Sequence, residues 1–356
     1  MSEQPRYRLV AHRFGEWGTR RCYRAAMNDN SGPEPLRWGI AATGKIAASM
    51  CEALGGLPDA EVVAVGSRSQ ESADAFASRF GIPNAHGSYE ALFGDPDVDI
   101  VYVASPHSHH HAMTIAAVEA GKHVLCEKAF AVNASQAREM VAAARHHDRF
   151  LMEAMWTWFI PAVVDIRQRV LDGAIGELKV IEANFAIPVT DPGGRHRRLD
   201  LAGGAMLDIG IYPVSFARFL AGDPVDAKVS GTLGDTGVDA TVAGVVTYSS
   251  GALGVFHTSL DMTGSHRASV YGTLGRIDVD APFWFPSGFT VRLTGEEPVH
   301  VDMANQGLAH EAAHAMDRIR GGHRESDVIP LATTVSTMEL LDDIRAQLCV
   351  VYPEER

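Results

Sequence analysis

The chain has 356 residues, of which 46% are hydrophobic and 21% are charged, values typical of a globular protein of about two domains. Its formal net charge of −13 argues against a nucleic acid or an anionic membrane as partner, because both would repel it. It has no apolar run of about 18 residues, so we expect no membrane-spanning helix. No two of the cysteines form a CxxC pair, which is typical of reduced thiols in a cytoplasmic protein and indicates no metal site. These cysteines are Cys22, Cys51, Cys126 and Cys349.

Residues 1–35 differ from the rest of the chain in charge. They carry a run of arginines in an otherwise acidic protein, and Met27 offers a second plausible start. We expect a flexible N-terminal arm over residues 1–35, which is either a start-site error or a partner-binding segment. The arginines are Arg6, Arg8, Arg13, Arg20, Arg21 and Arg24.

Residues 36–155 alternate short apolar runs with helical patterns. Leu36–Ala41 is the first expected strand. Further strands are expected over residues 61–66, 99–104, 124–126 and 150–154, with helices between them. This alternation predicts an α/β fold that begins with a doubly wound parallel sheet of the Rossmann type.

The turn after the first strand carries a weakened dinucleotide fingerprint. In the pattern G-x-G-x-x-G/A, Gly44 fills the second position and Ala47 the third, while Ala42 replaces the first glycine. The free N–H groups at the start of the following helix would bind phosphate. We therefore expect this turn to bind the cofactor, through Ala42, Thr43, Gly44, Lys45 and Ile46.

The end of the second strand predicts which cofactor is bound. An acidic residue there would hold the ribose 2′-hydroxyl of NAD, but this chain has Ser67 and Arg68. A hydroxyl and a guanidinium suit a 2′-phosphate. We therefore expect NADP(H) to be preferred over NAD(H); the alternative is an ordinary exposed arginine.

Further candidates follow the third strand. Ser105 is followed by four histidines within five positions. A metal site is not expected, because successive residues of a helix point in different directions and no cysteine or carboxylate lies nearby. We expect Ser105, His107 and His110 to face the cofactor.

The strand over residues 124–126 ends at Glu127 and Lys128. In open parallel sheets, ligands bind beyond the carboxyl ends of the strands. Both residues are therefore candidate cofactor contacts. A solvated surface Glu–Lys pair is the alternative.

Residues 156–356 read as an α+β domain. Strands are expected at 178–187, 226–232, 240–248, 252–259, 268–272 and 276–279, joined by short glycine-containing turns. This pattern predicts a large, mainly antiparallel open sheet with helices on one face. We expect a homodimer through its free face.

The segment Gly203–Tyr212 contains a second set of candidates. Asp208 and Tyr212 are four residues apart, so they would share one face of a helix. A carboxylate and a phenol on one face can transfer protons. The alternative is an aspartate in the first helical turn and a packed tyrosine.

Several motifs in order resemble the Gfo/Idh/MocA oxidoreductase family. The resemblance covers residues 36 to about 352 and is strongest for the branch of dimeric dihydrodiol dehydrogenase and NADP-dependent D-xylose 1-dehydrogenase. The motifs are Leu36–Ile40, Gly87–Leu92, Val124–Lys128, Leu151–Thr157 and Gly203–Tyr212.

The resemblance implies roles for individual residues. Lys128 corresponds to the lysine between nicotinamide and substrate, and Tyr212 to the proton donor or acceptor. Asp208 corresponds to a supporting carboxylate. Trp156 and Phe185 correspond to positions that line an aromatic substrate pocket, and Arg68 to the 2′-phosphate contact.

The chain also departs from the family. Ala129 stands where the family has a proline that is often in a cis bond, so Lys128 is either placed differently or followed by a strained bond. Tyr212 and Ser215 differ from the residues of inositol dehydrogenases. The basic loop over residues 193–198 is interpreted as a solvated rim; contact with substrate or cofactor phosphates is the alternative.

These observations predict an NADP-dependent oxidoreductase that transfers a hydride between nicotinamide and a sugar, dihydrodiol or dicarbonyl. Lys128 would lower the pKa of Tyr212, and Asp208 would orient Lys128 or share the proton path. The alternative is a non-catalytic NAD(P)-binding regulator of the same fold. Lys128 and Tyr212 favour the enzyme, and Ala129 favours the regulator. A glycosidase that uses NAD internally is disfavoured by Ser67 and Arg68.

Overall fold

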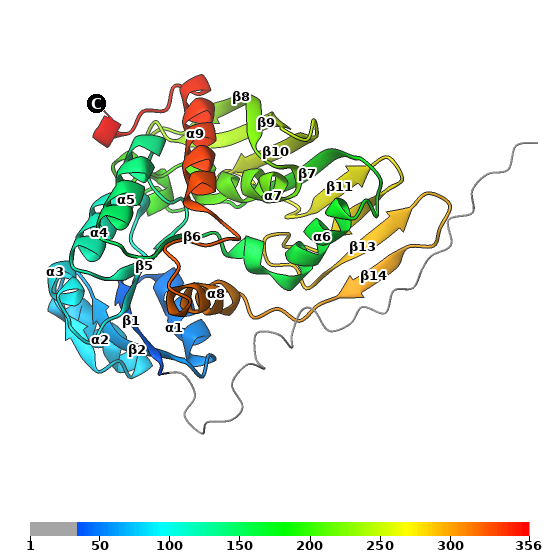
Figure 1. Cartoon of the computed structure of the whole chain (residues 1–356). Coiled ribbons are helices and arrows are strands. Elements are labelled where there is room, and N and C mark those ends of the chain that lie inside the picture. Colours follow the sequence, from blue (N-terminus) through cyan, green and yellow to red (C-terminus); the bar gives the residue numbers. More distant parts are fainter. Residues whose placement is uncertain (1–33, 356) are drawn as a thin grey trace, which may run out of the picture. The chain divides into compact units, whose positions relative to one another are not determined.

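Two β-sheets organise residues 34–355, the part of the chain that the computed structural model describes (Figure 1). The expected N-terminal arm, apart from its last two residues, lies outside this part, and so does Cys22. Within residues 34–355, no helix is long and apolar enough to cross a membrane. No group of histidine, cysteine or acidic side chains among those residues is placed to hold a metal ion.

The first sheet has the strand order β3-β2-β1-β4-β5-β6, and each neighbouring pair is parallel. The predicted doubly wound parallel sheet is therefore confirmed. β3 was not predicted, because its three half-buried residues form no apolar run. The strands are β1 (Leu36–Ala41), β2 (Ala60–Gly66), β3 (Asn84–His86), β4 (Ile100–Val103), β5 (His123–Glu127) and β6 (Leu151–Ala154).

Helices connect the strands of this sheet. At the N-terminus of several of these helices, a side chain accepts a hydrogen bond from a main-chain N–H group. The Ser69 hydroxyl accepts the N–H of Ser72 at the start of α2, and Asn133 accepts the N–H of Gln136 at the start of α5. By contrast, α1 begins at Gly44, which has no side chain to cap it. The helices are α1 (Lys45–Gly55), α2 (Gln70–Phe80), α3 (Tyr89–Phe93), α4 (His107–Glu119) and α5 (Ala134–His146).

The second sheet has the order β14-β13-β12-β11-β7-β10-β9-β8. β7 pairs with β10 in parallel, and the other neighbours are antiparallel, as predicted. β13 and β14 were not predicted. The strands are β7 (Leu178–Ala186), β8 (Pro224–Leu233), β9 (Asp239–Tyr248), β10 (Leu253–Ser259), β11 (Ala268–Gly272), β12 (Gly275–Val279), β13 (Gly288–Leu293) and β14 (Val299–Asp302).

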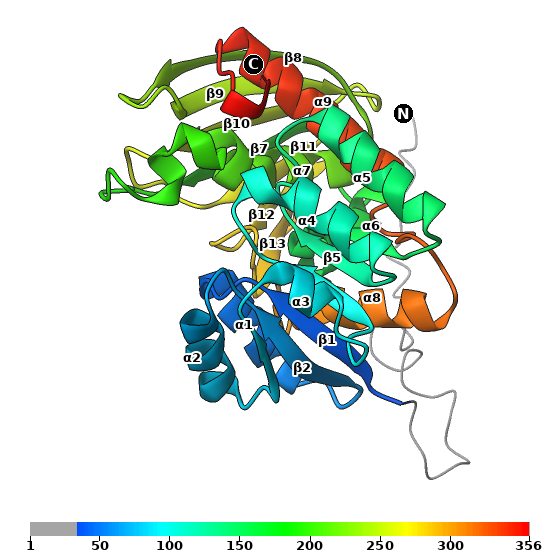
Figure 2. The same cartoon turned by 90° about the vertical axis from the view of Figure 1, so that its left-hand side faces the viewer.

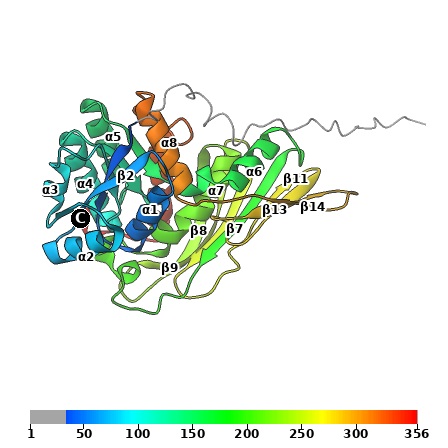
Figure 3. The same cartoon turned by 90° about the horizontal axis from the view of Figure 1, so that it is seen from below.

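Helices cover one face of the second sheet and connect it to the first. α7 (Ile211–Ala221) packs on β7 and β10, and Figure 3 shows it beside α6 (Pro161–Leu171). α9 (Leu331–Gln347) packs against both β8 and α5, which lie side by side with it in Figure 2. α8 (Ala309–Arg320) packs against α1. The residues after the second sheet therefore return to the nucleotide-binding sheet.

Candidate active site

Lys128 follows directly after β5, at the carboxyl edge of the parallel sheet. Its Nζ donates a hydrogen bond to the main-chain oxygen of Asp208 at 2.7 Å. Glu127 is buried: its carboxylate accepts the hydroxyl of Tyr102 and, at 3.2 Å, the N–H of Lys128. Burial raises the pKa of Glu127, although Lys128 and Tyr102 partly offset this effect. The Lys128–Ala129 peptide bond is cis, although Ala129 replaces the family proline.

The acceptor for Lys128 lies in an unusual helical turn. Met206–Gly210 forms a π-helix that runs directly into α7. Such turns redirect backbone hydrogen bonds and are frequent at functional sites. Here the Asp208 carbonyl bonds to Lys128, and the Lys128 Nζ lies 4.9 Å from the ring centroid of Tyr212. Asp208 and Tyr212 thus both lie beside Lys128, and the main chain of Asp208 accepts the hydrogen bond of the lysine.

The Asp208 carboxylate is buried and surrounded by cationic or basic groups. Arg195 Nη2 lies 2.9 Å from Oδ1, and His196 Nε2 lies 2.9 Å from Oδ2. Lys128 Nζ is 3.7 Å and His107 Nε2 4.0 Å from Oδ1. Burial by itself raises the pKa of Asp208, but Lys128, His196 and Arg195 hold it well below its ordinary value. Asp208 is therefore ionised at neutral pH.

The sequence analysis predicted that the basic loop is a solvated rim, but most of its basic side chains bind other parts of the protein. Arg195 and His196 bind Asp208, and Arg197 donates to the main-chain oxygens of Val189 and Leu260. Arg198 fits the expectation, because it is exposed and pairs with the exposed Asp200, whereas Arg195 is also exposed but reaches the buried Asp208. The sequence shows that this loop is basic. It does not show that the loop side chains point toward Asp208, because that contact exists only in the folded chain.

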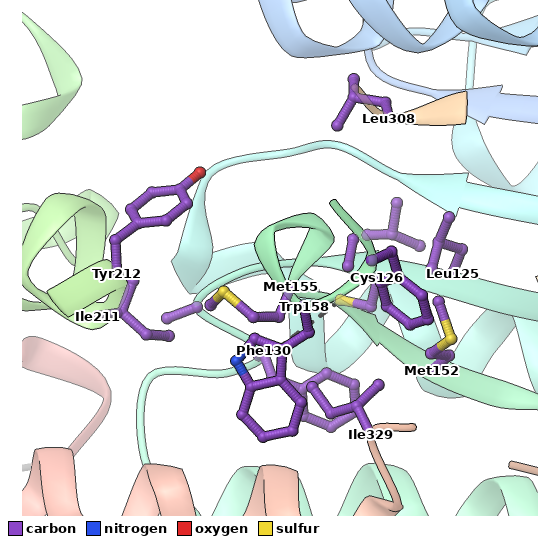
Figure 4. Packing of buried hydrophobic residues seen from close by; sticks show 14 of the residues in the cluster. Leu125, Cys126, Phe130, Met152, Met155, Trp158, Ile211, Tyr212, Leu308 and Ile329 are labelled. Carbon is purple, nitrogen blue, oxygen red and sulfur yellow. Dashed lines mark hydrogen bonds between the residues drawn. The ribbon is translucent and has the colours of Figure 1, made fainter. Parts of the chain in front are cut away.

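Tyr212 is a buried phenol held by Trp156. The indole Nε1 of Trp156 donates to the Tyr212 hydroxyl oxygen at 2.9 Å. Burial and the nearby Glu127 raise the pKa of Tyr212 well above its ordinary value, and the bond from Trp156 opposes this only in part. The net shift of the Tyr212 pKa is therefore upward, and the expected net lowering is not observed. Figure 4 shows Tyr212 at the edge of the buried cluster, with its hydroxyl directed away from Met155 and Phe130.

Aromatic side chains line the space beside Tyr212. The Phe185 ring stacks on Trp284 with centroids 3.5 Å apart and planes 3° apart, and it lies 5.5 Å from the Tyr212 ring. Trp156 lies edge-on to Tyr212 at 6.4 Å. Trp156 and Phe185, the residues expected to line a substrate pocket, thus lie beside Tyr212 together with Trp284, and we call these three rings the aromatic wall. The sequence analysis missed Trp284; the run Phe283–Phe285 was the available signal.

The turn expected to bind pyrophosphate connects the end of β1 to the start of α1. Ala42 has φ of 114°, a region that glycine adopts most easily, and it occupies the position of the missing glycine. A Cβ placed on Gly44 would meet no atom within 4 Å, so the space above this turn is open. Thr43 and Ile46 are half-buried, and Lys45 is exposed. The uncapped N–H groups of α1 therefore fit a phosphate ligand.

The residues expected at the ribose lie at the end of β2. Ser67 is buried and Arg68 exposed. The charge of Arg68 lies close enough to Tyr89 to oppose the burial that raises the pKa of that phenol. The Arg68 side chain is thus exposed near the carboxyl end of β2 and close to Tyr89.

Two of the four histidines after β4, His107 and His110, are buried inside the protein. His110 has its Nδ1 2.9 Å from Ala129 O and its Nε2 2.9 Å from Ser105 O, so protein atoms face both nitrogens. His107 has its Nδ1 3.0 Å from Ala202 O. Burial lowers the pKa of His107 to about 3 and that of His110 to about 4, so both rings are neutral. Ser105 is half-buried at the same strand exit.

A parallel dinucleotide-type sheet that presents a lysine and a tyrosine to an aromatic wall defines a nicotinamide-dependent oxidoreductase. The chain belongs to the GFO/IDH/MocA oxidoreductase family: the family model for an NAD-binding Rossmann fold matches residues 36–155, and the model for the GFO/IDH/MocA C-terminal domain matches residues 163–278. The enzyme interpretation is thereby confirmed over the non-catalytic regulator.

Curated relatives match nearly the whole chain. A trans-1,2-dihydrobenzene-1,2-diol dehydrogenase from Bos taurus is 37% identical over 335 residues, which cover 90% of this chain and 99% of the relative. The enzyme of the same name from Homo sapiens is 38% identical over 332 residues, with the same coverage.

Solved structures of related enzymes share the fold. An aldose-aldose oxidoreductase from Caulobacter crescentus complexed with glycerol has a TM-score of 0.80 and 25% identity, and the match covers 88% of this chain and 97% of that one. A 3-ketoreductase from Actinomadura kijaniata in complex with NADP and TDP-benzene has a TM-score of 0.79 and 28% identity, with 88% and 98% covered.

Proposed function

We propose that the protein is an NADP(H)-dependent dehydrogenase or reductase that interconverts CH–OH and C=O in a sugar, a dihydrodiol or a dicarbonyl. The observation that carries this proposal is the position of the Lys128 ammonium over the ring of Tyr212, whose hydroxyl is held by Trp156. A cation and a phenol at the carboxyl edge of the sheet can polarise and protonate one oxygen atom. The names of the curated relatives support a dihydrodiol as substrate, and the related aldose-aldose oxidoreductase supports a sugar.

The cofactor would lie along the carboxyl edge of the first sheet. Residues 42–46 would hold its pyrophosphate at the start of α1, and Ser105, His107, His110 and Glu127 would form the floor below its nicotinamide end. When bound, the nicotinamide supplies or accepts the hydride. Lys128 would face both this group and the substrate.

Tyr212 would transfer the proton. Because its pKa is raised, it is a protonated phenol at neutral pH and can donate to the oxygen that gains charge when a carbonyl is reduced. Lys128 would stabilise the charge on that oxygen. Asp208, through its main-chain oxygen, would orient Lys128.

The preference for NADP(H) is supported by the residues after β2. Ser67 offers a hydroxyl, and exposed Arg68 offers a guanidinium that can bind phosphate bidentately. A related 3-ketoreductase was solved with NADP. An NAD-specific site would instead carry a carboxylate at this position.

The substrate would lie against the aromatic wall. Phe185 and Trp284 offer flat apolar surfaces, and Tyr212 and Lys128 offer polar contacts at one edge of them. Such a site suits a flat or ring-shaped molecule that carries adjacent hydroxyl or keto groups.

A homodimer through the open face of the second sheet is part of the proposal. Val245 on β9 and Val255 on β10 are exposed there. They border a hollow of about 640 Å³ that is also lined by His257 and Arg267. A mixed apolar and polar face of this kind suits a symmetric contact with a second copy. A cytoplasmic location is supported by Cys51, Cys126 and Cys349, which are free thiols.

A titration would test the proposed function directly. The fluorescence of NADPH and of NADH is followed during addition of purified protein, and turnover is then measured on aldoses, dicarbonyls and dihydrodiols. We expect tighter binding of NADPH and turnover of at least one class. Tight binding without turnover on any of them would contradict the proposed substrates, and equal binding of both cofactors would contradict the assignment of Arg68.

A further inference from the structure

We propose that Arg195 and His196 are positioning residues: they occupy both carboxylate oxygens of Asp208 and thereby leave the charge of Lys128 free to act on the substrate oxygen and on Tyr212. This inference rests on the proposed roles of Lys128 and Tyr212. It assigns a function to the basic loop, which the proposed mechanism does not otherwise use.

The two carboxylate oxygens and the main-chain oxygen of Asp208 have different hydrogen-bond partners. Arg195 Nη2 lies 2.9 Å from Oδ1, and His196 Nε2 lies 2.9 Å from Oδ2. Lys128 Nζ is 3.7 Å from Oδ1, beyond hydrogen-bond distance, and bonds to the main-chain oxygen instead. The carboxylate therefore forms its hydrogen bonds with the loop, whereas the lysine is bound by an uncharged carbonyl.

The charges explain why this division matters. An isolated Lys–Asp pair in a buried site would be neutral, and its field on a third group would be weak. With Arg195 added, the group of Lys128, Asp208 and Arg195 carries a net positive charge. That charge faces Tyr212, whose pKa is raised by burial, Glu127, Asp208 and, from α8, Glu311. Arg195 thus offsets a carboxylate that would otherwise oppose ionisation of the phenol.

The other groups around Asp208 do not replace Arg195. His107 on α4 reaches Oδ1 at 4.0 Å, but burial lowers its pKa to about 3, so it is neutral. Tyr102 on β4 donates to Glu127 and leaves Asp208 untouched. Arg195 therefore supplies the permanent positive charge on the loop side of this carboxylate.

The loop has enough other anchors to survive the loss of Arg195. The N–H of Val189 donates to Leu260 O at 2.8 Å. The hydroxyl of Tyr352 donates to Gly203 O at 2.7 Å. These bonds hold the chain on both sides of the loop. We therefore expect a substitution at Arg195 to remove a charge without disturbing the fold.

The experiment compares Arg195→Met with Arg198→Met. Both variants remove one arginine from the same loop, but Arg198 pairs with the exposed Asp200. Alcohol oxidation is measured against pH, together with NADPH affinity and melting temperature. In Arg195→Met, Lys128 can pair with the freed Oδ1 and the phenol becomes harder to ionise. The rate of alcohol oxidation at a fixed pH should then fall by about tenfold for each full pKa unit by which the Tyr212 phenol is raised.

The controls separate the charge of Arg195 from a general effect on the loop. Arg198→Met should behave like the wild type, because it leaves the partners of Asp208 in place. Arg195→Lys should recover most of the loss, because it restores the positive charge. Matching pH profiles in Arg195→Met and Arg198→Met would overturn the proposal.

A second readout does not depend on turnover. Acetylation of Lys128 by acetic anhydride is followed by mass spectrometry at a fixed pH in each variant. Pairing with the freed carboxylate keeps the amine protonated, so Lys128 should react several-fold more slowly in Arg195→Met than in Arg198→Met. Equal rates would refute the positioning role even if the wild type turned over no substrate, and a wild type without turnover would by itself contradict only the proposed function.

Discussion

The ammonium of Lys128 lies 2.7 Å from the main-chain oxygen of Asp208 and 3.7 Å from its carboxylate. The lysine is therefore oriented by a backbone carbonyl of a π-helical turn, while the carboxylate is held by Arg195 and His196. This arrangement places a positive charge beside a protonated phenol. Substitutions and pH profiles can test what that pair and its surroundings do.

Replacement of Tyr212 by phenylalanine should remove the proton donor. We expect Tyr212→Phe to lower turnover by about 100-fold or more, the usual contribution of a general acid, with NADPH affinity within about twofold of wild type because the ring is kept. Steady-state kinetics and fluorescence titration measure the two effects. Trp156→Phe removes the hydrogen bond to the hydroxyl but keeps an aromatic ring beside Tyr212, so it should have a smaller effect on turnover. Near-normal turnover in Tyr212→Phe would exclude Tyr212 as the donor.

The pH dependence should differ between the two directions of the reaction. Because the pKa of Tyr212 lies well above its ordinary value, the phenol is protonated across the neutral range. Carbonyl reduction, which needs the proton, should be nearly constant between about pH 6 and 9, whereas alcohol oxidation, which needs the ionised form, should rise with pH throughout. A rate of oxidation that levels off near pH 7 would contradict this assignment.

Arg68 should select the cofactor. Arg68→Ala should weaken NADPH binding by about 10- to 100-fold, the loss of a charge-assisted bidentate contact, and should leave NADH binding unchanged. Arg79→Ala is the matched control, because Arg79 is also exposed and lies on the following helix, where it pairs with Glu52. The prediction fails if both variants lose the same affinity for NADPH.

The protein should be more stable with glycine than with alanine at the position of Ala42. Its φ of 114° is unfavourable for a residue with a Cβ, so Ala42→Gly should raise the free energy of unfolding by about 1 kcal/mol. Ala53→Gly in α1 is the control of opposite sign and should lower it by about 1 kcal/mol. Denaturant unfolding of both variants measures the difference, and destabilisation in Ala42→Gly would show that the turn tolerates alanine.

The open face of the second sheet should carry the proposed dimer contact. Val255→Asp places a charge among its exposed apolar side chains and should produce monomers in sedimentation velocity, because an unpaired charge disfavours burial. Val164→Asp on α6 is the control, since Val164 is similarly exposed but lies on a helix. Dimers that persist in Val255→Asp would exclude this face.

Local patterns predicted most of the fold. β1 and β11 have the expected bounds, because each combines an apolar run with a turn at its end. β3 and β14 were missed because they are short and largely polar, so their strand geometry depends on neighbours that lie elsewhere in the sequence.

The sequence by itself determined the parallel sheet, the turn at Gly44, and the candidates Lys128 and Tyr212, because periodicity, turn residues and strand ends are local properties. The tertiary structure decided which groups meet. In the folded chain, Arg195 and His196 bind the Asp208 carboxylate, and a main-chain carbonyl accepts the hydrogen bond of Lys128. Trp284 stacks on Phe185, and burial raises the pKa of Tyr212. These features depend on burial and on contacts between residues that are not neighbours in the sequence, and both arise only when the chain folds.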